Sequence, residues 1–599
     1  MKKLDPILTQ ILWSRLISIA DEAATGLVRT SFSSAVRDFH DYSCGLFDVS
    51  GHLLAHSTKT TTAFIGVMPY LMQHFLQHFP VSSLKPGDAL ATNDPWQGTG
   101  HAYDICIASP IFHKGEVAGF SICIVHHLDV GGRMATTESK DMYEEGLRIP
   151  MIKLYQEGKM DPALREMIKA NVREPEKMLG DIRAQIVSNN VCGRGLIAML
   201  DDYVLTAKTL EELSHQICDR SEKSLREKIL QVPDGIYRNS VTLPPIGNVS
   251  GIYVNVAVEV RGDEIFIDYE GSSPEVSAAV NVTFNMTRSY SMYPIKLALD
   301  PGVPNNEGTF RPVSVKAPEG SLLNCKPPAP TWGRTMICHN LPEIIFGALA
   351  QAIPDRVIAG SGATPLVFTY FRAKRKDGKT YVGINSSMGG LGASSQGDGP
   401  SCRGFPYNVG NIPIETVEND LPLIYLRKVL LPDSAGAGRN RGGLGQEFEF
   451  EIASGPLGPA GSCVVSIRGS GRKPDSPYPV FGLVGGGVGK GEALTLNGVD
   501  IPHGPQQQLK EGDRLRMALP GGGGYGDPYE RNPAQVVEDV RLGYVTVEAA
   551  KEEYGVVIDA AGQYDERASQ AFRNSVFKER EHDEKYAEWE ASGGIRQEI

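Results

Sequence analysis

The chain has 599 residues, of which 41% are hydrophobic and 22% charged, and it carries a formal net charge of −12. This length allows more than one domain, because single hydrophobic cores stop growing near about 250–300 residues. The acidic balance without a basic cluster excludes a nucleic-acid binder, and the lack of a long apolar run or export signal predicts a cytoplasmic protein with no membrane partner.

The first predicted element is an amphipathic helix over residues 6–29, which begins at Asp5-Pro6 and carries apolar residues at helical spacing. From about 43 to 127 the pattern changes to short strands. Two apolar, β-branched runs, YDICIASPIF and EVAGFSICIVHH, are separated by the turn sequence HKGE at 113–116. We therefore expect a β-hairpin at this position.

A helical stretch follows the predicted hairpin. One helix opens at Asp161-Pro162, a second begins at Glu174-Pro175, and helical spacing continues over residues 201–230. These helices are expected to form a layer over the strands.

The second half begins with another hairpin signal. Between 252 and 270, IYVNVAVEV and EIFIDYEG alternate apolar and polar residues around Arg261-Gly262-Asp263. The Pro- and Gly-rich tracts at 301–330 and 387–411 predict long ordered loops. After Pro520, two short helices and a charged segment at 565–591 are expected, the latter a solvated helix or a disordered end.

The predicted fold is therefore mixed α/β (α+β), in which antiparallel hairpins carry a metal site and are covered by helices. We place a metal-binding α/β region at 1–235 and a second α/β region with long loops at 236–528. A helical C-terminal tail occupies 529–599.

Five residues that can bind metal are concentrated in the predicted hairpin region: His101, Asp104, His126, His127 and Asp129. Imidazole and carboxylate groups together bind Zn²⁺, Mn²⁺ or Fe²⁺ without a sulfur ligand. A hairpin brings the two His-containing strand ends together. The alternative is that these are loop side chains that bond to their own backbone, but five of them on one hairpin favour a metal site.

Strand geometry restricts which of these residues meet. Adjacent residues point to opposite faces of a strand, so only one of His126 and His127 is expected to reach the metal, and a one-residue shift of register would exchange them. His101 and Asp104 are three residues apart and cannot share a face of a regular strand. We place them on a turn before the strand, which Gly98 and Gly100 favour.

Two glycine-rich stretches, 484–493 and 520–528, are poor candidates for a phosphate-binding loop. The second lacks the closing Gly-Lys-Ser/Thr, and in the first Gly491 stands in place of Ser or Thr. Tight turns are the better interpretation, so ATP would have to bind on another protein.

Six motifs resemble the hydantoinase B/oxoprolinase family, and the resemblance extends from about residue 4 to 560. They are DYSCGLFD (41–48), NDPWQGTGHAYDICIASPIF (93–112), HHLDVGG (126–132), YEEGLRIP (143–150), DPGVPNNEG (300–308) and PGGGGYGDPYERNP (520–533). One departure is the stretch 98–101, Gly-Thr-Gly-His, where the family commonly has Gly-Gly-Thr-His.

The resemblance implies a metal centre with Asp41, His101, Asp104 and His126 as ligands. His127 and Asp129 would then face the substrate or support the ligands. We favour Zn²⁺ over Mn²⁺. The resemblance also implies an ATP- and Mg²⁺-binding partner of the hydantoinase A type in an (αβ)₂ assembly, and leaves open a role for bicarbonate.

The expected function is that of the metal-binding subunit of an ATP-dependent cyclic amidohydrolase that opens a lactam, hydantoin or oxoproline-type ring. The metal would polarise the carbonyl or activate a water, while the partner supplies phosphoryl chemistry. One alternative is a subunit of an ATP-dependent acetone or acetophenone carboxylase, although this chain is shorter than those subunits usually are. Another is a non-catalytic scaffold with a structural metal, which the cysteine-free ligand set disfavours.

Overall fold

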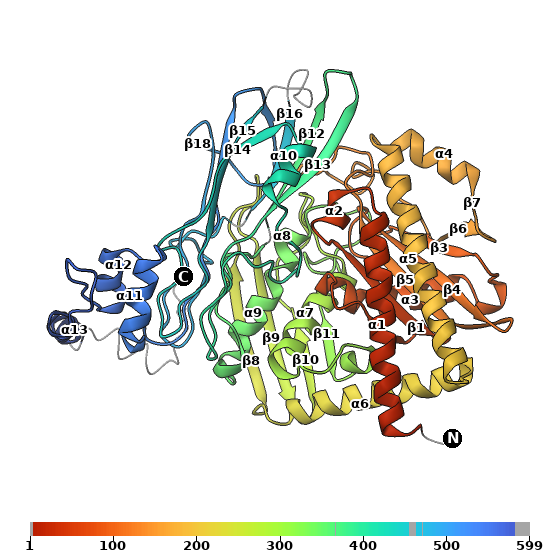
Figure 1. Cartoon of the computed structure of the whole chain (residues 1–599), viewed down its shortest axis with the longest axis horizontal. Coiled ribbons are helices and arrows are strands. Elements are labelled where there is room, and N and C mark those ends of the chain that lie inside the picture. The colour runs from red at the N-terminus through yellow and green to blue at the C-terminus, as the bar shows by residue number, and fades with distance from the viewer. Residues whose placement is uncertain (1–3, 366, 454–462, 470, 581–599) are drawn as a thin grey trace.

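The protein is described from a computed structural model that covers residues 4–580 apart from 366, 454–462 and 470. The described chain forms four β-sheets with helices packed between and around them (Figure 1). This arrangement confirms the predicted mixed α/β class.

The N-terminal sheet carries the predicted metal-binding residues and is antiparallel throughout. Its strand order is β2-β1-β5-β4-β3-β6-β7. The strands are β1 (Tyr42–Asp48), β2 (Leu53–His56), β3 (Ala89–Thr92), β4 (Asp104–His113), β5 (Glu116–His126), β6 (Ile152–Gln156) and β7 (Lys159–Met160). The predicted hairpin is confirmed, because His113 pairs with Glu116 across the turn between β4 and β5.

Helices cover both faces of this sheet. Helices α1 (Pro6–Thr30) and α5 (Pro175–Asp202) pack on each other and on one face, where α5 contacts β4 and β5. On the other face, β1 contacts α3 (Thr62–His78), and α3 packs on α7 (Phe284–Leu299). The inner strands are therefore buried on both sides (Figure 1).

Helix α3 corrects the expectation of short strands throughout 43–127. Six of its apolar side chains recur at helical spacing and are buried: Phe64, Val67, Met68, Leu71, Met72 and Phe75. This spacing is the pattern of an amphipathic helix, so the expectation of strands over residues 62–78 was wrong. The helix packs between β1 and α7.

The predicted helical layer is confirmed with one interruption. Asp161 caps α4 (Pro162–Asn171), and α5 begins at Pro175. The spacing over 201–230 belongs to two helices, because α5 ends at Asp202 and α6 (Ala207–Ile229) begins after a short break capped by Thr206. Short helix α2 (Ser34–Arg37) precedes β1.

A four-stranded sheet of order β11-β10-β9-β8 opens the second half. Its strands are β8 (Gly235–Thr242), β9 (Tyr253–Arg261), β10 (Glu264–Asp268) and β11 (Val313–Lys316). Arg261 pairs with Glu264, which confirms the second predicted hairpin. Helix α9 (Leu341–Leu349) packs on β8 and β9.

Two further sheets complete the β-structure. The first has the order β13-β12-β16-β19, with β12 (Val367–Lys374), β13 (Thr380–Ser387), β16 (Cys463–Arg468) and β19 (Gln506–Leu509). The second has the order β14-β15-β20-β17-β18, with β14 (Leu423–Leu430), β15 (Gln446–Ile452), β17 (Ala493–Leu496), β18 (Val499–Asp500) and β20 (Arg514–Ala518). Short helices α8 (Thr335–Cys338) and α10 (Ile414–Asp420) lie in the connections.

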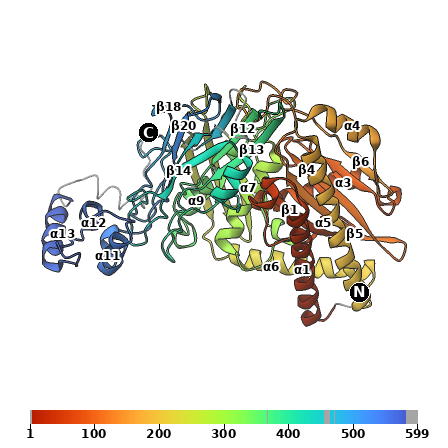
Figure 2. The same ribbon diagram turned by 45° about the horizontal axis from the view of Figure 1, so that its top comes forward.

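The largest group of buried apolar residues runs from Ala35 to Tyr525 and draws on all four sheets. A separate small core holds the C-terminal helices α11 (Pro533–Arg541) and α12 (Val547–Tyr554). Figures 1 and 2 show these helices and α13 (Glu566–Arg580) extending away from the sheets. The predicted boundaries at 235 and 528 remain predictions, and residues 581–591 of the charged segment lie outside the described residues.

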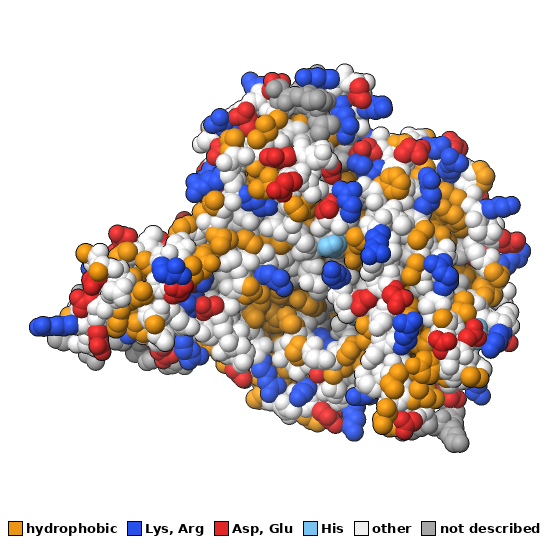
Figure 3. All heavy atoms as spheres, in the orientation of Figure 1, with side chains coloured by type: hydrophobic (Ala, Val, Ile, Leu, Met, Phe, Trp, Pro, Cys, Tyr) orange, Lys and Arg blue, Asp and Glu red, His pale blue; other side chains and the backbone are white. Residues whose placement is uncertain are grey.

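The surface charge and the composition of the helices are relevant to the predictions that the protein binds neither nucleic acid nor a membrane. Charged side chains of both signs are interspersed over the face shown in Figure 3, without a continuous basic band. In the part of the chain that the structure describes, no helix has the length and apolar character needed to cross a membrane.

The glycine-rich stretch at 520–524 is not the tight turn expected from the sequence. It runs extended between other glycine-containing segments and bonds to them through the backbone. Gly522 N donates to Gly443 O at 2.8 Å, and Gly523 N donates to Gly360 O at 2.8 Å. Glycine allows this close backbone approach, since an added Cβ at Gly522 would collide with the Leu391 carbonyl oxygen.

We predict that Gly522→Ala lowers the free energy of unfolding by about 1–3 kcal/mol, because the new methyl group overpacks a backbone contact. Gly397→Ala is the matched control, since nothing lies within 4 Å of its added Cβ. Denaturant unfolding of both variants checks this, and equal midpoints would contradict the packing argument.

Candidate metal centre

The ends of three neighbouring strands bring the predicted ligands together. Asp41 immediately precedes β1, Asp104 is the first residue of β4, and His126 is the last residue of β5. Because these strands are antiparallel neighbours, these three positions lie at the same end of the sheet, and Asp104 pairs directly with His126. His101 lies in the turn just before β4, as the spacing predicts.

His101, Asp104 and His126 form one compact cluster. Each offers a ligand atom, and these atoms all lie within 4.8 Å of one another. Oδ1 of Asp104 is 2.9 Å from Nε2 of His101 and 2.8 Å from Nδ1 of His126. All three side chains are at most 2% exposed. Two imidazoles and a carboxylate so placed suit a borderline divalent cation such as Zn²⁺ or Mn²⁺.

The hydrogen bonding of His101 also fits a metal ligand. Its buried Nδ1 has no hydrogen-bond partner among the described residues, and its Nε2 faces the Asp104 carboxylate at 2.9 Å. Burial and the nearby Arg334 lower the pKa of His101 to about 3, so its imidazole is neutral at physiological pH. A neutral, unpartnered imidazole nitrogen is the form that binds a metal.

Asp41 lies at the margin of this cluster. Its Oδ2 is 3.9 Å from Nδ1 of His126, while its Oδ1 accepts a hydrogen bond from Thr61. Burial raises the pKa of Asp41 to about 6, and the charge of Asp104 acts in the same direction. A bound cation would favour its ionised form, but its role as a ligand remains a prediction.

Arg334, which lies in the connection between β11 and α8, was not identified from any sequence motif. Its Nη2 is 3.1 Å from Oδ2 of Asp104, and its Nε donates to the Thr99 carbonyl oxygen at 2.6 Å. Burial opposes ionisation of Asp104, yet the two imidazoles and Arg334 hold the pKa of Asp104 well below its ordinary value. Asp104 is therefore a carboxylate and a competent ligand.

Two tyrosines frame His126 and were also not identified from the sequence. The ring of Tyr103 stacks on that of His126 with centroids 5.8 Å apart, and the Tyr370 hydroxyl lies 3.2 Å from His126 Nε2. Because Nδ1 faces Asp104 and Nε2 faces Tyr370, the ring orientation of His126 is fixed from both sides. Tyr370 comes from β12, so a second sheet closes over the cluster.

The structure separates the two predicted catalytic residues from the cluster. His127 faces the opposite side of the sheet, where its Nε2 lies 3.3 Å from Oε1 of Gln185 in α5. Asp129 pairs with Arg173 at 2.6 Å and accepts a hydrogen bond from Gly131 N. The catalytic roles of His127 and Asp129 remain predictions, and both residues make contacts that hold the polypeptide in place.

Glu145 stabilises the turn that carries Arg334. Its carboxylate accepts hydrogen bonds from the backbone N–H groups of Thr331 and Trp332 at 2.7 and 2.8 Å. Burial raises the pKa of Glu145 from 4.5 to about 7 despite these hydrogen bonds. The residue belongs to the YEEGLRIP motif, whose contribution is thus to position residues 331–334.

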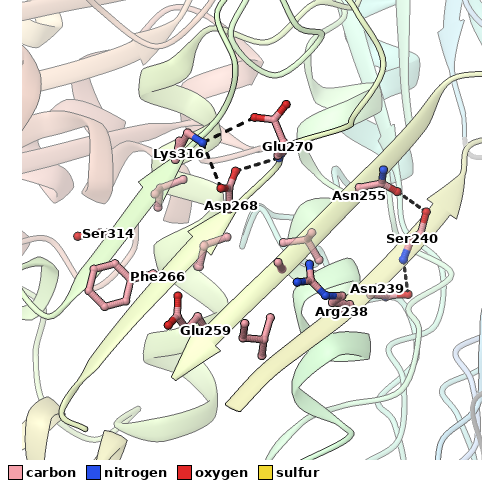
Figure 4. Close-up of a pocket in the computed structure, with 15 residues that line it drawn as sticks. Arg238, Asn239, Ser240, Asn255, Glu259, Phe266, Asp268, Glu270, Ser314 and Lys316 are labelled. Atoms are coloured by element: carbon pink, nitrogen blue, oxygen red, sulfur yellow. Dashed lines mark hydrogen bonds and ion pairs between the residues drawn. The ribbon is translucent and has the colours of Figure 1, made fainter. Parts of the chain in front are cut away.

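A hollow of about 630 Å³ lies elsewhere, on the outer face of the sheet β8–β11. Figure 4 shows that Lys316 contacts both Asp268 and Glu270 on this surface. Histidine and cysteine are absent from its lining residues. It does not provide the imidazole ligands of a zinc-type site.

A buried histidine–carboxylate cluster at the strand ends of a mixed α/β protein defines a candidate metalloprotein with nitrogen and oxygen ligands. The chain belongs to the Hydantoinase B/oxoprolinase family, whose family model matches residues 5–528. This match confirms the resemblance seen in the six sequence motifs.

Individual relatives resemble the chain over most of its length. The caprolactamase subunit beta of Pseudomonas jessenii is 32% identical, and the match covers 96% of this chain and 100% of that protein. The crystal structure of the ATP-dependent caprolactamase from Pseudomonas jessenii matches with a TM-score of 0.84 at 30% identity, over 96% of this chain and 100% of that one. A nucleotide-free acetone carboxylase structure matches with a TM-score of 0.85 at 20% identity, over 98% and 84%, which shows a shared fold.

We predict that His126→Ala abolishes binding of a divalent ion, whereas His127→Ala retains it. The reason is that His126 faces Asp104 and His127 faces Gln185 on the other side of the sheet. Elemental analysis of the two purified variants measures this directly. Loss of metal from His127→Ala together with retention in His126→Ala would show the opposite assignment.

We also predict that Glu145 makes stability depend on pH. The folded state holds the Glu145 proton more tightly than the unfolded state, so this contribution is complete below pH 4.5 and is lost as the pH rises through about 7. Between pH 5 and 8 the wild type should lose about 2–3 kcal/mol more unfolding free energy than Glu145→Gln, which mimics the protonated acid. An equal change in unfolding free energy between pH 5 and 8 in the wild type and in Glu145→Gln would contradict this.

Proposed function

We propose that the chain is the metal-binding subunit of an ATP-dependent cyclic amide hydrolase that opens a lactam, hydantoin or oxoproline-type ring. The observation that carries the proposal is the buried cluster of His101, Asp104 and His126. It occurs in a chain that is 32% identical, over nearly its whole length, to a caprolactamase subunit. An unstrained amide resists hydrolysis, so coupling to ATP gives the ring opening a driving force.

In this proposal His101, Asp104 and His126 hold the cation, with Asp41 as a fourth ligand and Zn²⁺ preferred over Mn²⁺. When bound, such an ion polarises a carbonyl group or lowers the pKa of a water toward about 7. Arg334 keeps Asp104 ionised, and Tyr370 fixes the ring of His126. The absence of cysteine ligands favours a catalytic over a structural metal, and substrate would take a fourth position beside three protein ligands or a fifth position beside four.

ATP and Mg²⁺ would bind to a separate hydantoinase A-type subunit, and we propose an (αβ)₂ assembly. Two observations support this division. The Pseudomonas jessenii relative is itself named a subunit. In addition, the glycine-rich stretch at 520–524 bonds its backbone N–H groups to other backbone segments, so these groups are not free to cradle a phosphate.

A ketone carboxylase is the second candidate, with bicarbonate as a substrate. Its support is the fold shared with acetone carboxylase, whose sequence is only 20% identical to this one. The higher identity to caprolactamase over the full length of both chains favours amide opening.

The test is ATP turnover by this chain mixed with its hydantoinase A-type partner, assayed with a panel of lactams, hydantoins, 5-oxoproline and ketones. We expect cyclic amides to stimulate ATP hydrolysis and the isolated chain to bind no ATP by calorimetry. His101→Ala/His126→Ala should lose metal and activity together, whereas Gly397→Ala should keep both. Stimulation by ketones and bicarbonate alone would establish the carboxylase instead.

A further inference from the structure

Arg468 is a buried cation next to the metal cluster. It is the last residue of β16, it is 2% exposed, and it pairs in register with Phe368 of β12. Its guanidinium carbon lies 4.4, 4.8 and 5.1 Å from the ring centroids of Phe368, Trp332 and Tyr370. Aromatic faces therefore surround this charge.

Other buried arginines have carboxylate partners. Arg334 pairs with Asp104 and Arg472 pairs with Glu343. For Arg468, the described residues supply no carboxylate within ion-pair distance, and its Nη1 and Nη2 donate to the neutral hydroxyls of Thr335 and Tyr370 at 2.6 and 2.8 Å. A buried charge without a counter-charge is costly, so an anion that binds there would be strongly favoured.

Two hydrogen-bond donors at this position have no acceptor. Arg468 Nε and Trp332 Nε1 are buried and have no hydrogen-bond partner among the residues described, and the guanidinium of Arg468 lies against the Trp332 ring. Arginine and tryptophan N–H groups can donate but cannot accept. A ligand that complements them must bring acceptors, and the positive charge requires those acceptors to be anionic.

Tyr370 joins this group of donors to the metal cluster. Its hydroxyl oxygen lies 2.8 Å from Arg468 Nη2 and 3.2 Å from His126 Nε2. The Arg468 charge is thus one side chain away from the proposed metal ligand His126. An anion held at Arg468 would lie beside the reacting centre.

We propose that Arg468, Trp332 and Tyr370 form a binding subsite for a small carboxyl-type oxyanion next to the metal cluster. The position beside a reacting centre rests on the proposed function, whereas the anion site itself rests only on the contacts of Arg468. Two sources supply this chemistry: the carboxylate that forms when water opens a cyclic amide, and dissolved bicarbonate. Delocalised charge and two planar oxygens suit a guanidinium.

A purely structural Arg468 is the competing explanation, because its two hydrogen bonds and three ring contacts join β16, β12 and α8. The two explanations differ in what an added anion does. A ligand that binds only the folded state raises the unfolding temperature as its concentration rises. A structural arginine stabilises the fold without any dependence on added carboxylate.

The experiment measures the thermal unfolding midpoint of the full chain with increasing formate or bicarbonate, at ionic strength held constant with chloride. Phosphate serves as a tetrahedral probe, and metal content is measured in every sample. The variants are Arg468→Met and Tyr370→Phe. Their matched controls are Arg427→Met, an exposed arginine of β14, and Tyr381→Phe, another buried tyrosine of the same sheet.

We expect formate or bicarbonate to raise the midpoint of the wild type and both controls. Arg468→Met should weaken the apparent affinity at least tenfold, and Tyr370→Phe several-fold, with metal content unchanged. A response to formate alone assigns the site to the carboxylate product, and a response to bicarbonate points to the dissolved ion. The anion dependence of the unfolding midpoint is measured without ATP turnover, so this experiment is separate from the test of the proposed function.

Three results would overturn the subsite: no response of the wild type beyond that to chloride, a response to phosphate only, or an unchanged response in Arg468→Met. Loss of anion binding only in samples that have also lost metal would assign the anion to the metal and would likewise remove the role of Arg468. A lower midpoint in Arg468→Met without any anion dependence of the wild type would establish the structural explanation.

Discussion

Asp104 is fully buried at the start of β4, and its negative charge has to be balanced inside the protein. The imidazoles of His101 and His126 face one carboxylate oxygen, and Arg334 faces the other. The groups that balance this charge come from the turn before β4, from the end of β5 and from the connection before α8. That connection lies more than two hundred residues further along the chain. Much of the architecture between the N-terminal sheet and β12 serves to hold these groups in contact.

The supporting contacts extend outward from this charge in two directions. Glu145 accepts hydrogen bonds from the turn that carries Arg334, and so links the loop after β5 to the second half of the chain. Tyr370 links His126 to Arg468, and so connects the cluster to a second buried charge. The histidine–carboxylate cluster and Arg468 are therefore parts of one polar network enclosed by apolar layers.

The extended glycine segments have a different role: they allow backbone segments to pack closely against one another without intervening side chains. Residues 520–524 satisfy their N–H groups with carbonyl oxygens from several other segments rather than from a single neighbouring strand. A side chain at these positions would block the approach. The C-terminal helices pack on their own small core beyond this region, with Ala437 as a member from the preceding segments.

Local sequence was sufficient for the elements whose signals are local. The α1 cap at Asp5-Pro6, the turn between β4 and β5, and the alternation that separates His126 from His127 depend on residues a few positions apart. The predicted hairpin marked five candidate metal-binding residues near its strand ends, and the family resemblance selected His101, Asp104 and His126 among them. Family resemblance added Asp41, which no local pattern marks. Residues 62–78 were wrongly expected to form strands, although their apolar residues recur at helical spacing.

Tertiary structure alone decided which distant residues complete the site. Arg334, Tyr370 and Arg468 belong to no local sequence motif. Nothing in the sequence shows that Arg334 contacts Asp104, that Tyr370 contacts His126 or that Arg468 contacts Tyr370. Their positions follow from the packing of one sheet on another, where the balance of buried charge depends on contacts between residues far apart in the chain. The sequence by itself therefore determined which candidate metal-binding residues gather at the strand ends, and the packed fold determined the charges and donors around them.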